Sequence, residues 1–126
     1  MEVNVPHIVD ELTKAFERYE KALVENDLNT LDDLFWSSDE VVRYGATENL
    51  YGHEQILAFR KQRPSAGLER VLRNTVITTF GTDFGTANTE FSRAHDSRIG
   101  RQSHCWARFP ERWKIVAAHV SWMDGQ

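Results

Sequence analysis

The sequence predicts one α+β domain over residues 1–126, in which N-terminal helices pack on a strongly curved, mainly antiparallel sheet. Apolar residues recur at helical spacing in the first half of the chain, and after Leu68 their spacing changes to a period of two. Hydrophobic residues make up 40% of the chain, which is enough for a packed core and unlike a disordered segment. Helices followed by strands are typical of a sheet whose one face is covered by helices.

The first half of the chain is expected to form three helices. Residues 7–26 place apolar side chains at helical spacing and charges on the opposite face. A cap at Asn29 or Thr30 is expected to start a short second helix that ends near residue 36. Residues 53–63 read as the third helix, because their apolar side chains again share one side.

Strands account for the rest of the predicted fold. Residues 40–52, EVVRYGATENLYG, read as two short strands joined by a turn. Four long segments rich in Thr, Val, Phe and Trp follow, and their short connections favour an antiparallel meander: 68–80, 84–95, 97–109 and 112–123. A twisted sheet wrapped round a long helix forms a cone, which leaves a cavity near its open mouth.

Composition narrows the classes of function. The formal charge of −4 argues against general nucleic-acid binding, which needs a basic field. No apolar run approaches the roughly 20 residues that cross a bilayer, and the start MEVNVPHIVDEL does not resemble a signal peptide. Cys105 is the only cysteine and the five histidines lack metal-ligand spacing. We therefore expect a cytoplasmic protein with no membrane contact, disulfide, metal or cofactor.

The basic residues are strongly biased toward arginine. Of the fifteen basic residues, eleven are Arg and four are Lys. The planar guanidinium suits carboxylates and phosphates, so an excess of arginine can indicate anion recognition. The alternative is codon usage in a high-GC genome, which would account for most of these arginines without any function.

Several polar residues lie on apolar faces of the predicted elements. Tyr19 shares a helical stripe with apolar residues, so it is either a core tyrosine with its hydroxyl at the core edge or a functional group. Arg43 and Tyr44 must point to opposite faces of a strand, and the pattern does not say which points inward. His119 and Ser121 continue the face of apolar residues on the last strand, either as satisfied core residues or as pocket residues.

Three further strand residues are weaker candidates. Arg73 and Gln102 are polar residues among apolar neighbours, like the pair on the last strand. Glu90 is the sheet carboxylate best placed to be an inward general base, or an exposed cross-strand ion partner.

Four long blocks in order resemble the AtzH/HpxZ-like (DUF3225) family of the NTF2-like, SnoaL-like superfamily. The blocks are RYEKALVENDLNTLDDLFW, RYGATENLYGHEQILAFRKQRP, RNTVITTFGTDFGTANTEF and GRQSHCWARFPERWKIVAAHVS. The tail W-x-I-V-x-x-H-x-S is the most recognisable superfamily feature. The resemblance implies one NTF2-like, cone-shaped domain.

The resemblance also implies an activity. Members of the family accompany amidases in s-triazine and purine (oxalurate) breakdown, and the AtzH branch removes a carboxylate from 1,3-dicarboxyurea to yield allophanate. It thus implies a catabolic enzyme that decarboxylates, or cleaves a C–N bond of, a small anionic ureido or N-carboxyurea compound. A helix tyrosine and a first-strand arginine are tied to activity in that branch, and Tyr19 and Arg43 match them as catalytic residues.

The remaining expectations concern substrate binding and partners. Arg73, His119, Ser121 and Gln102 are expected to bind the rest of the substrate. A homodimer or tetramer is expected, with an amidase as a further partner. Two alternatives stay open: a non-catalytic ligand-binding or assembly partner of an amidase, and a SnoaL-like cyclase or ketosteroid-isomerase-like enzyme.

Overall fold

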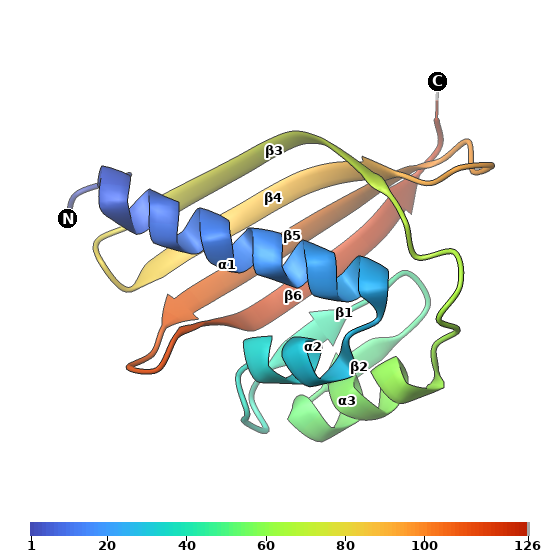
Figure 1. Ribbon diagram of the computed structural model, residues 1–126, viewed down its shortest axis with the longest axis horizontal. Helices are drawn as coiled ribbons and strands as arrows, with labels where there is room; N and C mark the ends of the chain where they lie inside the picture. Colours follow the sequence, from blue (N-terminus) through green and yellow to red (C-terminus); the bar gives the residue numbers. More distant parts are fainter. Residues whose placement is uncertain (126) are drawn as a thin grey trace.

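A computed structural model describes residues 1–125 and contains three helices and one six-stranded sheet. The long helix α1 (Pro6–Glu25) lies across one face of the sheet, while α2 (Leu28–Leu34) and α3 (His53–Gln62) gather beside its short strands (Figure 1). The strands are β1 (Val42–Tyr44), β2 (Asn49–Tyr51), β3 (Val71–Phe80), β4 (Phe84–Ser92), β5 (Ile99–Arg108) and β6 (Trp113–Met123). This arrangement confirms the predicted α+β fold.

The strand order in the sheet is β2-β1-β6-β5-β4-β3. The four long strands form the predicted antiparallel meander, and β1 joins the other edge of β6 in parallel. The parallel pairing places the short β1–β2 hairpin next to the last strand, although some seventy residues separate them in sequence. Among residues 1–125, no helix is long and apolar enough to cross a membrane.

Helix α1 begins and ends where local chemistry dictates. Pro6 occupies the first helical position, where its missing N–H costs nothing. Asn26 adopts the left-handed conformation at the end, and its N–H binds the carbonyls of the last turn. The second helix follows at once, so its cap is Asp27, whose carboxylate accepts the Thr30 N–H at 3.2 Å. The expected cap at Asn29 or Thr30 was therefore wrong, because the break between the helices is shorter than the pattern indicated.

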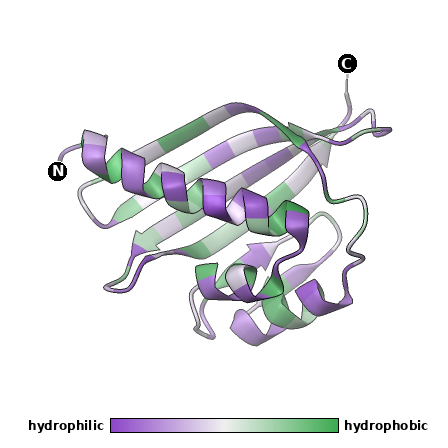
Figure 2. Cartoon of the chain, in the orientation of Figure 1, coloured by the Kyte–Doolittle hydropathy of each residue, from purple (hydrophilic) through white to green (hydrophobic). Residues whose placement is uncertain are grey.

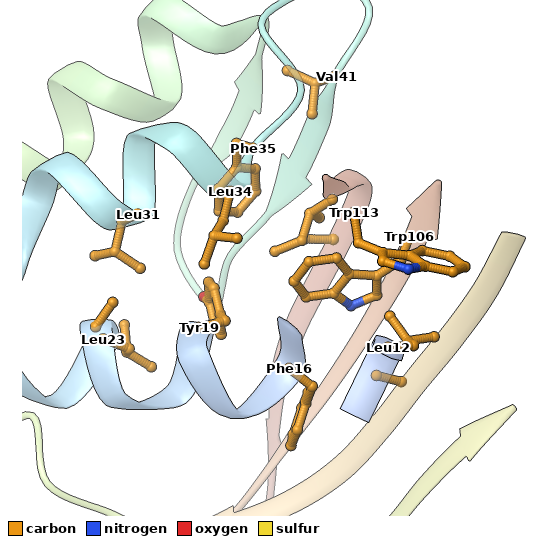
Figure 3. Packing of buried hydrophobic residues seen from close by; sticks show 14 of the residues in the cluster. Leu12, Phe16, Tyr19, Leu23, Leu31, Leu34, Phe35, Val41, Trp106 and Trp113 are labelled. Atoms are coloured by element: carbon orange, nitrogen blue, oxygen red, sulfur yellow. The ribbon is translucent and has the colours of Figure 1, made fainter. Parts of the chain in front are cut away.

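One apolar stripe of α1 forms the centre of the core. The stripe alternates with hydrophilic positions along the helix (Figure 2). Tyr19 lies in this stripe and faces the side chains of α2 and the segment after it (Figure 3). Phe35 packs edge-on against its ring at 6.2 Å, and Trp106 on β5 is fully buried further along. The core thus holds the Tyr19 ring rigidly from several sides.

A β-bulge in β6 decides which of its residues face α1. Cys105 pairs with Ala117 but Trp106 pairs with Ile115, so Val116 is an extra residue. Before the bulge the inward residues are odd-numbered, and after it they are even-numbered, ending at Trp122. The bulge therefore exchanges the two faces of the strand halfway along its length.

Candidate active site

A cavity of about 170 Å³ lies where α1 ends, at the mouth of the curved sheet. Its walls come from the end of α1, the β1–β2 hairpin, the end of α3, and the adjoining ends of β4, β5 and β6. Four arginines and one glutamate are its ionisable lining residues apart from Tyr19: Arg43, Arg63, Arg70, Arg93 and Glu48. Such a lining carries a net positive charge, which favours an anionic ligand.

Tyr19 presents its hydroxyl to this cavity from the core. Only 1% of the residue is exposed, and its phenol oxygen accepts a hydrogen bond from Arg60 Nη2 at 2.9 Å. Burial by itself would raise the pKa of Tyr19, but the guanidinium groups of Arg60, Arg43 and Arg70 outweigh it and lower the pKa below its usual value. The phenol is therefore more acidic than its buried position alone would make it.

Arg43 points inward from β1 and its neighbour Tyr44 points outward. The Arg43 side chain is buried, lies 5.1 Å from the centre of the Phe59 ring, and has Glu48 Oε1 at 3.6 Å from Nη1. This Nη1 atom has no hydrogen-bond partner within residues 1–125. Burial and the nearby charge of Arg60 lower the pKa of Arg43. Arg43 thus lines the cavity with a charge that the long ion pair to Glu48 balances only in part.

Arg70 is held by a network that reaches across the sheet. Its guanidinium binds both carboxylate oxygens of Glu20, with the shortest contact at 2.6 Å, and donates to Gln102 Oε1 at 2.8 Å. Gln102 in turn donates to Glu20 at 3.1 Å, and the guanidinium lies 4.4 Å from the centre of the Phe91 ring. Fully paired groups of this kind are rigid, so Arg70 and Gln102 form a fixed wall.

Arg63 and Arg93 stand at the outer part of the cavity with unused donors. Burial and the charge of Arg60 lower the pKa of Arg63 to about 10, and burial followed by the charge of Arg70 lowers the pKa of Arg93. The Nε atoms of both residues are buried and unpaired in the described chain. An anion in the cavity would relieve the repulsion between these cations.

His104 packs against Tyr19 in the core and does not line the cavity. Its ring meets the Tyr19 ring edge-on at 4.7 Å and is 1% exposed. Burial, followed by the charges of Arg70, Arg43 and Arg60, lowers the pKa of His104 well below its usual value. His104 is therefore neutral at physiological pH and acts as packing for Tyr19.

The structure brings Tyr19, Arg43 and Gln102 together, as the sequence predicted, but not the other expected site residues. His119 is exposed on the opposite face of β6, where its ring packs at 5.8 Å against Tyr44. Ser121 shares that outer face and accepts a hydrogen bond from Arg101 at 3.2 Å. Their expected position was wrong because the β6 bulge turns the even-numbered residues inward after Ala117.

Arg73 and Glu90 also lie outside the cavity. Leu72 faces the core, so strand alternation turns Arg73 to solvent, where it pairs in register with Glu90. Glu90 accepts a hydrogen bond from Asn74 at 2.9 Å and is a cross-strand partner, which was one of the two interpretations of this residue. Neither side chain lines the cavity.

The sequence interpretation missed three of the four lining arginines. Arg63 and Arg70 lie in the segment around the α3–β3 connection, and Arg93 lies just beyond β4. None of them stands on an apolar stripe, so no periodicity marked them. The excess of arginine was the one signal, and it concerned the whole chain rather than these positions.

A larger cleft of about 390 Å³ lies at the other end of the sheet, round the β5–β6 turn. Its charged side chains are paired with one another or with neighbouring helices. Arg108 contacts Glu11 at 3.0 Å, Glu11 also accepts from Trp113 at 3.2 Å, and Arg112 pairs with Asp33. With its charges already matched, this cleft offers less to an anion than the smaller cavity does.

No group of three or more His, Cys, Asp and Glu side chains in the described 125 residues is arranged to hold a metal ion. The donor set of the cavity is dominated by guanidinium groups, which repel cations and do not coordinate them. The chemistry that the cavity supports is therefore that of anion binding and proton transfer by a phenol.

The AtzH-like family model matches residues 1–126. A Pectobacterium atrosepticum protein of unknown function from the DUF3225 family is 58% identical, with a TM-score of 0.95 over 97% of this chain and 95% of that one. A cystatin-like fold protein from Burkholderia xenovorans is 48% identical, with a TM-score of 0.96 over 100% and 99%. An NTF2-like protein from Pseudomonas putida, at 17% identity and a TM-score of 0.72 over 89% and 84%, shares the fold. Comparison with functionally curated proteins gives no match.

Proposed function

We propose that this chain, which belongs to the AtzH-like family, is an enzyme acting on a small anionic ureido compound of the N-carboxyurea or oxalurate type. The single observation that carries this proposal is the small cavity lined by four guanidinium groups, into which the Tyr19 phenol points. Charge-assisted hydrogen bonds from arginine to a carboxylate are worth roughly 1.5–3 kcal/mol each. A small planar anion would balance a lining that carries four guanidinium groups and one carboxylate.

The size of the cavity supports a small substrate over a large apolar one. Pockets for drug-sized ligands usually measure about 300–1,000 Å³, whereas this cavity measures about 170 Å³. Seven of the thirteen lining residues are polar or charged, so the lining is not mainly apolar. This favours a ureido carboxylate over the polyketide or steroid substrate of a SnoaL-like cyclase or ketosteroid-isomerase-like enzyme.

The proposed step is decarboxylation of an N-carboxylate. The bond between nitrogen and the carboxylate carbon breaks, carbon leaves as carbon dioxide, and the bonding electron pair stays on nitrogen. That nitrogen takes the proton of Tyr19, and the phenolate then recovers a proton from water. Arg43 binds the substrate and stabilises charge that develops on the urea oxygen, while Tyr19 acts as general acid. Hydrolysis of another ureido C–N bond would also need a water molecule to attack the carbonyl carbon, with Arg43 and Tyr19 in the same two roles.

Gln102 and Arg70 supply a wall that orients the substrate. The Gln102 amide is hydrogen-bonded to Glu20 and Arg70, so its role is to hold Arg70 in place and not to bind the substrate directly. Arg63 and Arg93 face the remaining end of the substrate from the outer part of the cavity. We assign them to carboxylate binding in place of Arg73, His119 and Ser121.

The test is incubation of the purified protein alone with 1,3-dicarboxyurea, oxalurate and allophanate, followed by mass spectrometry of substrate and products. Turnover that is lost in Tyr19→Phe and Arg43→Met supports the proposal. Matched controls are Tyr51→Phe, which removes a hydroxyl from a half-exposed ring, and Arg101→Met, which removes a guanidinium from the outer sheet face. Both controls should turn over substrate at the parent rate.

Binding of these anions without turnover would contradict the enzyme proposal. It would favour the ligand-binding or assembly module that serves a partner amidase, and adding the amidase would then decide between the two roles. Absence of both binding and turnover would refute the anion site itself.

We also propose that the protein assembles as a homodimer or tetramer. Large apolar side chains are exposed outside the core, among them Val71 at 63%, Val76 at 56% and Tyr51 at 52%. Exposed apolar groups of this kind suit contact with another protein surface, a second copy or an amidase. Light scattering after gel filtration measures the mass, and a monomer would contradict the homo-oligomer.

A further inference from the structure

Arg60 is a buried cation with no anionic partner. It lies on α3 and is 2% exposed, and its only side-chain acceptor among residues 1–125 is the Tyr19 oxygen at 2.9 Å. Its Nε and Nη1 atoms have no hydrogen-bond partner among residues 1–125. The rings of Phe35 and Tyr19 lie 5.6 and 5.8 Å from its guanidinium carbon and only partly replace water. An unpaired buried charge destabilises a fold, so packing does not explain an arginine here.

The geometry assigns Arg60 as the positioning residue of Tyr19, whose phenol proton it turns toward the cavity. A guanidinium carries donors only and cannot lose its proton under ordinary conditions. The bond from Nη2 therefore occupies an acceptor site on the Tyr19 oxygen and leaves the O–H to point elsewhere. Tyr19 is also a lining residue of the cavity, so the free O–H can point into it. Arg60 does not line the cavity and acts through Tyr19.

Arg60 also stabilises the phenolate that remains after proton transfer. This inference rests on the proposed role of Tyr19 as general acid. The charged or titratable groups round the phenol are Arg60 from α3, Arg63 at the end of α3, Arg43 from β1, Arg70 before β3, Glu20 from α1 and His104 from β5. Of these groups, only Arg60 donates a hydrogen bond to the Tyr19 oxygen. The loss of Arg60 should therefore affect the ionisation of Tyr19 more than the loss of any arginine that lines the cavity.

The three tyrosines of the chain allow this to be measured without substrate. Tyr44 and Tyr51 are at the surface, 37% and 52% exposed, so Tyr44→Phe/Tyr51→Phe should fold and leave Tyr19 as the only tyrosine. Titration of tyrosinate absorbance in this background should give a midpoint below the ordinary value of about 10. Adding Arg60→Met should raise the midpoint by about 1 to 3 pH units.

Arg63→Met in the same background is the matched control. It removes a guanidinium that lines the cavity and donates to Asn26. Arg63 acts on Tyr19 only through its charge and makes no hydrogen bond to it, so the midpoint should move less than in Arg60→Met. A Tyr19 midpoint that is the same with and without Arg60 would overturn the inference, and so would a midpoint at or above 10 in the parent background. Should Arg60→Met not fold, Arg60→Lys takes its place, because it keeps the charge but loses the planar fork of donors. Its Tyr19 midpoint should lie above that of the parent background, and an unchanged midpoint would overturn the inference.

A pH–rate profile adds a readout that a purely structural residue would not move. Because the acid form of Tyr19 is the active form, the rate should fall as pH rises through its pKa, and Arg60→Lys should shift that fall to higher pH. The titration succeeds or fails independently of turnover, so failure of the proposed function leaves this test intact.

Discussion

Replacing Tyr19 by phenylalanine separates the stability and the chemistry of this site. The change removes one oxygen atom and leaves the ring, which is 1% exposed and packed against Phe35 and His104. Arg60 then loses its acceptor at 2.9 Å while its charge stays buried. A hydrogen bond to a charged group is worth about 1.5–3 kcal/mol, so the free energy of unfolding should fall by about that amount.

For a domain of this length, each kcal/mol lowers the unfolding midpoint by roughly 3–5 °C, so Tyr19→Phe should unfold roughly 5–15 °C below the parent. Loss of a general acid should lower kcat by roughly 100-fold to 10,000-fold. Scanning calorimetry and turnover of an N-carboxyurea measure the two effects on the same preparation.

The double variant Tyr19→Phe/Arg60→Met distinguishes lost hydrogen bonding from damaged packing. It removes the stranded charge together with its acceptor, so stability should return toward the parent value while activity stays lost. Tyr51→Phe, in which a ring that is 52% exposed loses its hydroxyl, should change neither property. Stability and turnover like those of the parent in Tyr19→Phe would refute the reasoning. If the double variant were no more stable than Tyr19→Phe, the lost stability would come from damaged packing and not from the stranded charge.

Three further predictions test the arginine site, its loop and its floor. Arg43→Lys keeps the charge but loses the planar fork, so KM for a ureido carboxylate should rise at least about tenfold, and an unchanged KM would contradict bidentate binding. Hydrogen bonds from Arg98 lower the pKa of Asp96 to about 2. The contribution of this carboxylate to the free energy of unfolding is therefore present above about pH 4 and is lost as pH falls toward 2. The urea midpoint of unfolding, measured from pH 2 to 5, should therefore change less with pH in Asp96→Asn than in the parent protein. An equal pH dependence in the two proteins would contradict a stabilising contact between Asp96 and Arg98. A Cβ at Gly100 would overlap the ring of Phe91, which forms the floor of the cavity beneath Arg70. Gly100→Ala should therefore displace this ring and weaken substrate binding, whereas a change that affected stability alone would leave substrate binding unchanged.

The sequence by itself determined the fold class and the type and order of its elements. Apolar periods of 3.6 and two are local properties, and the short connections leave the four long strands little choice but a meander. Tyr19 could be singled out in the same way, because a polar atom on an apolar helix stripe is visible in a single segment. Arg43 could be marked as a candidate, although whether Arg43 or Tyr44 points inward depended on the parallel pairing of β1 with β6.

Only the tertiary structure decided which polar groups share the cavity. The extra residue at Val116 exchanges the faces of β6, so His119 moved outward and Trp122 inward, and no periodicity in the strand announces such a bulge. Arg60 lies on α3 and Arg93 directly follows β4, and these segments lie near the end of α1 only in the folded protein. Their influence on Tyr19 and on the ligand is electrostatic, so it depends on distances in space, whereas sequence patterns record only distances along the chain.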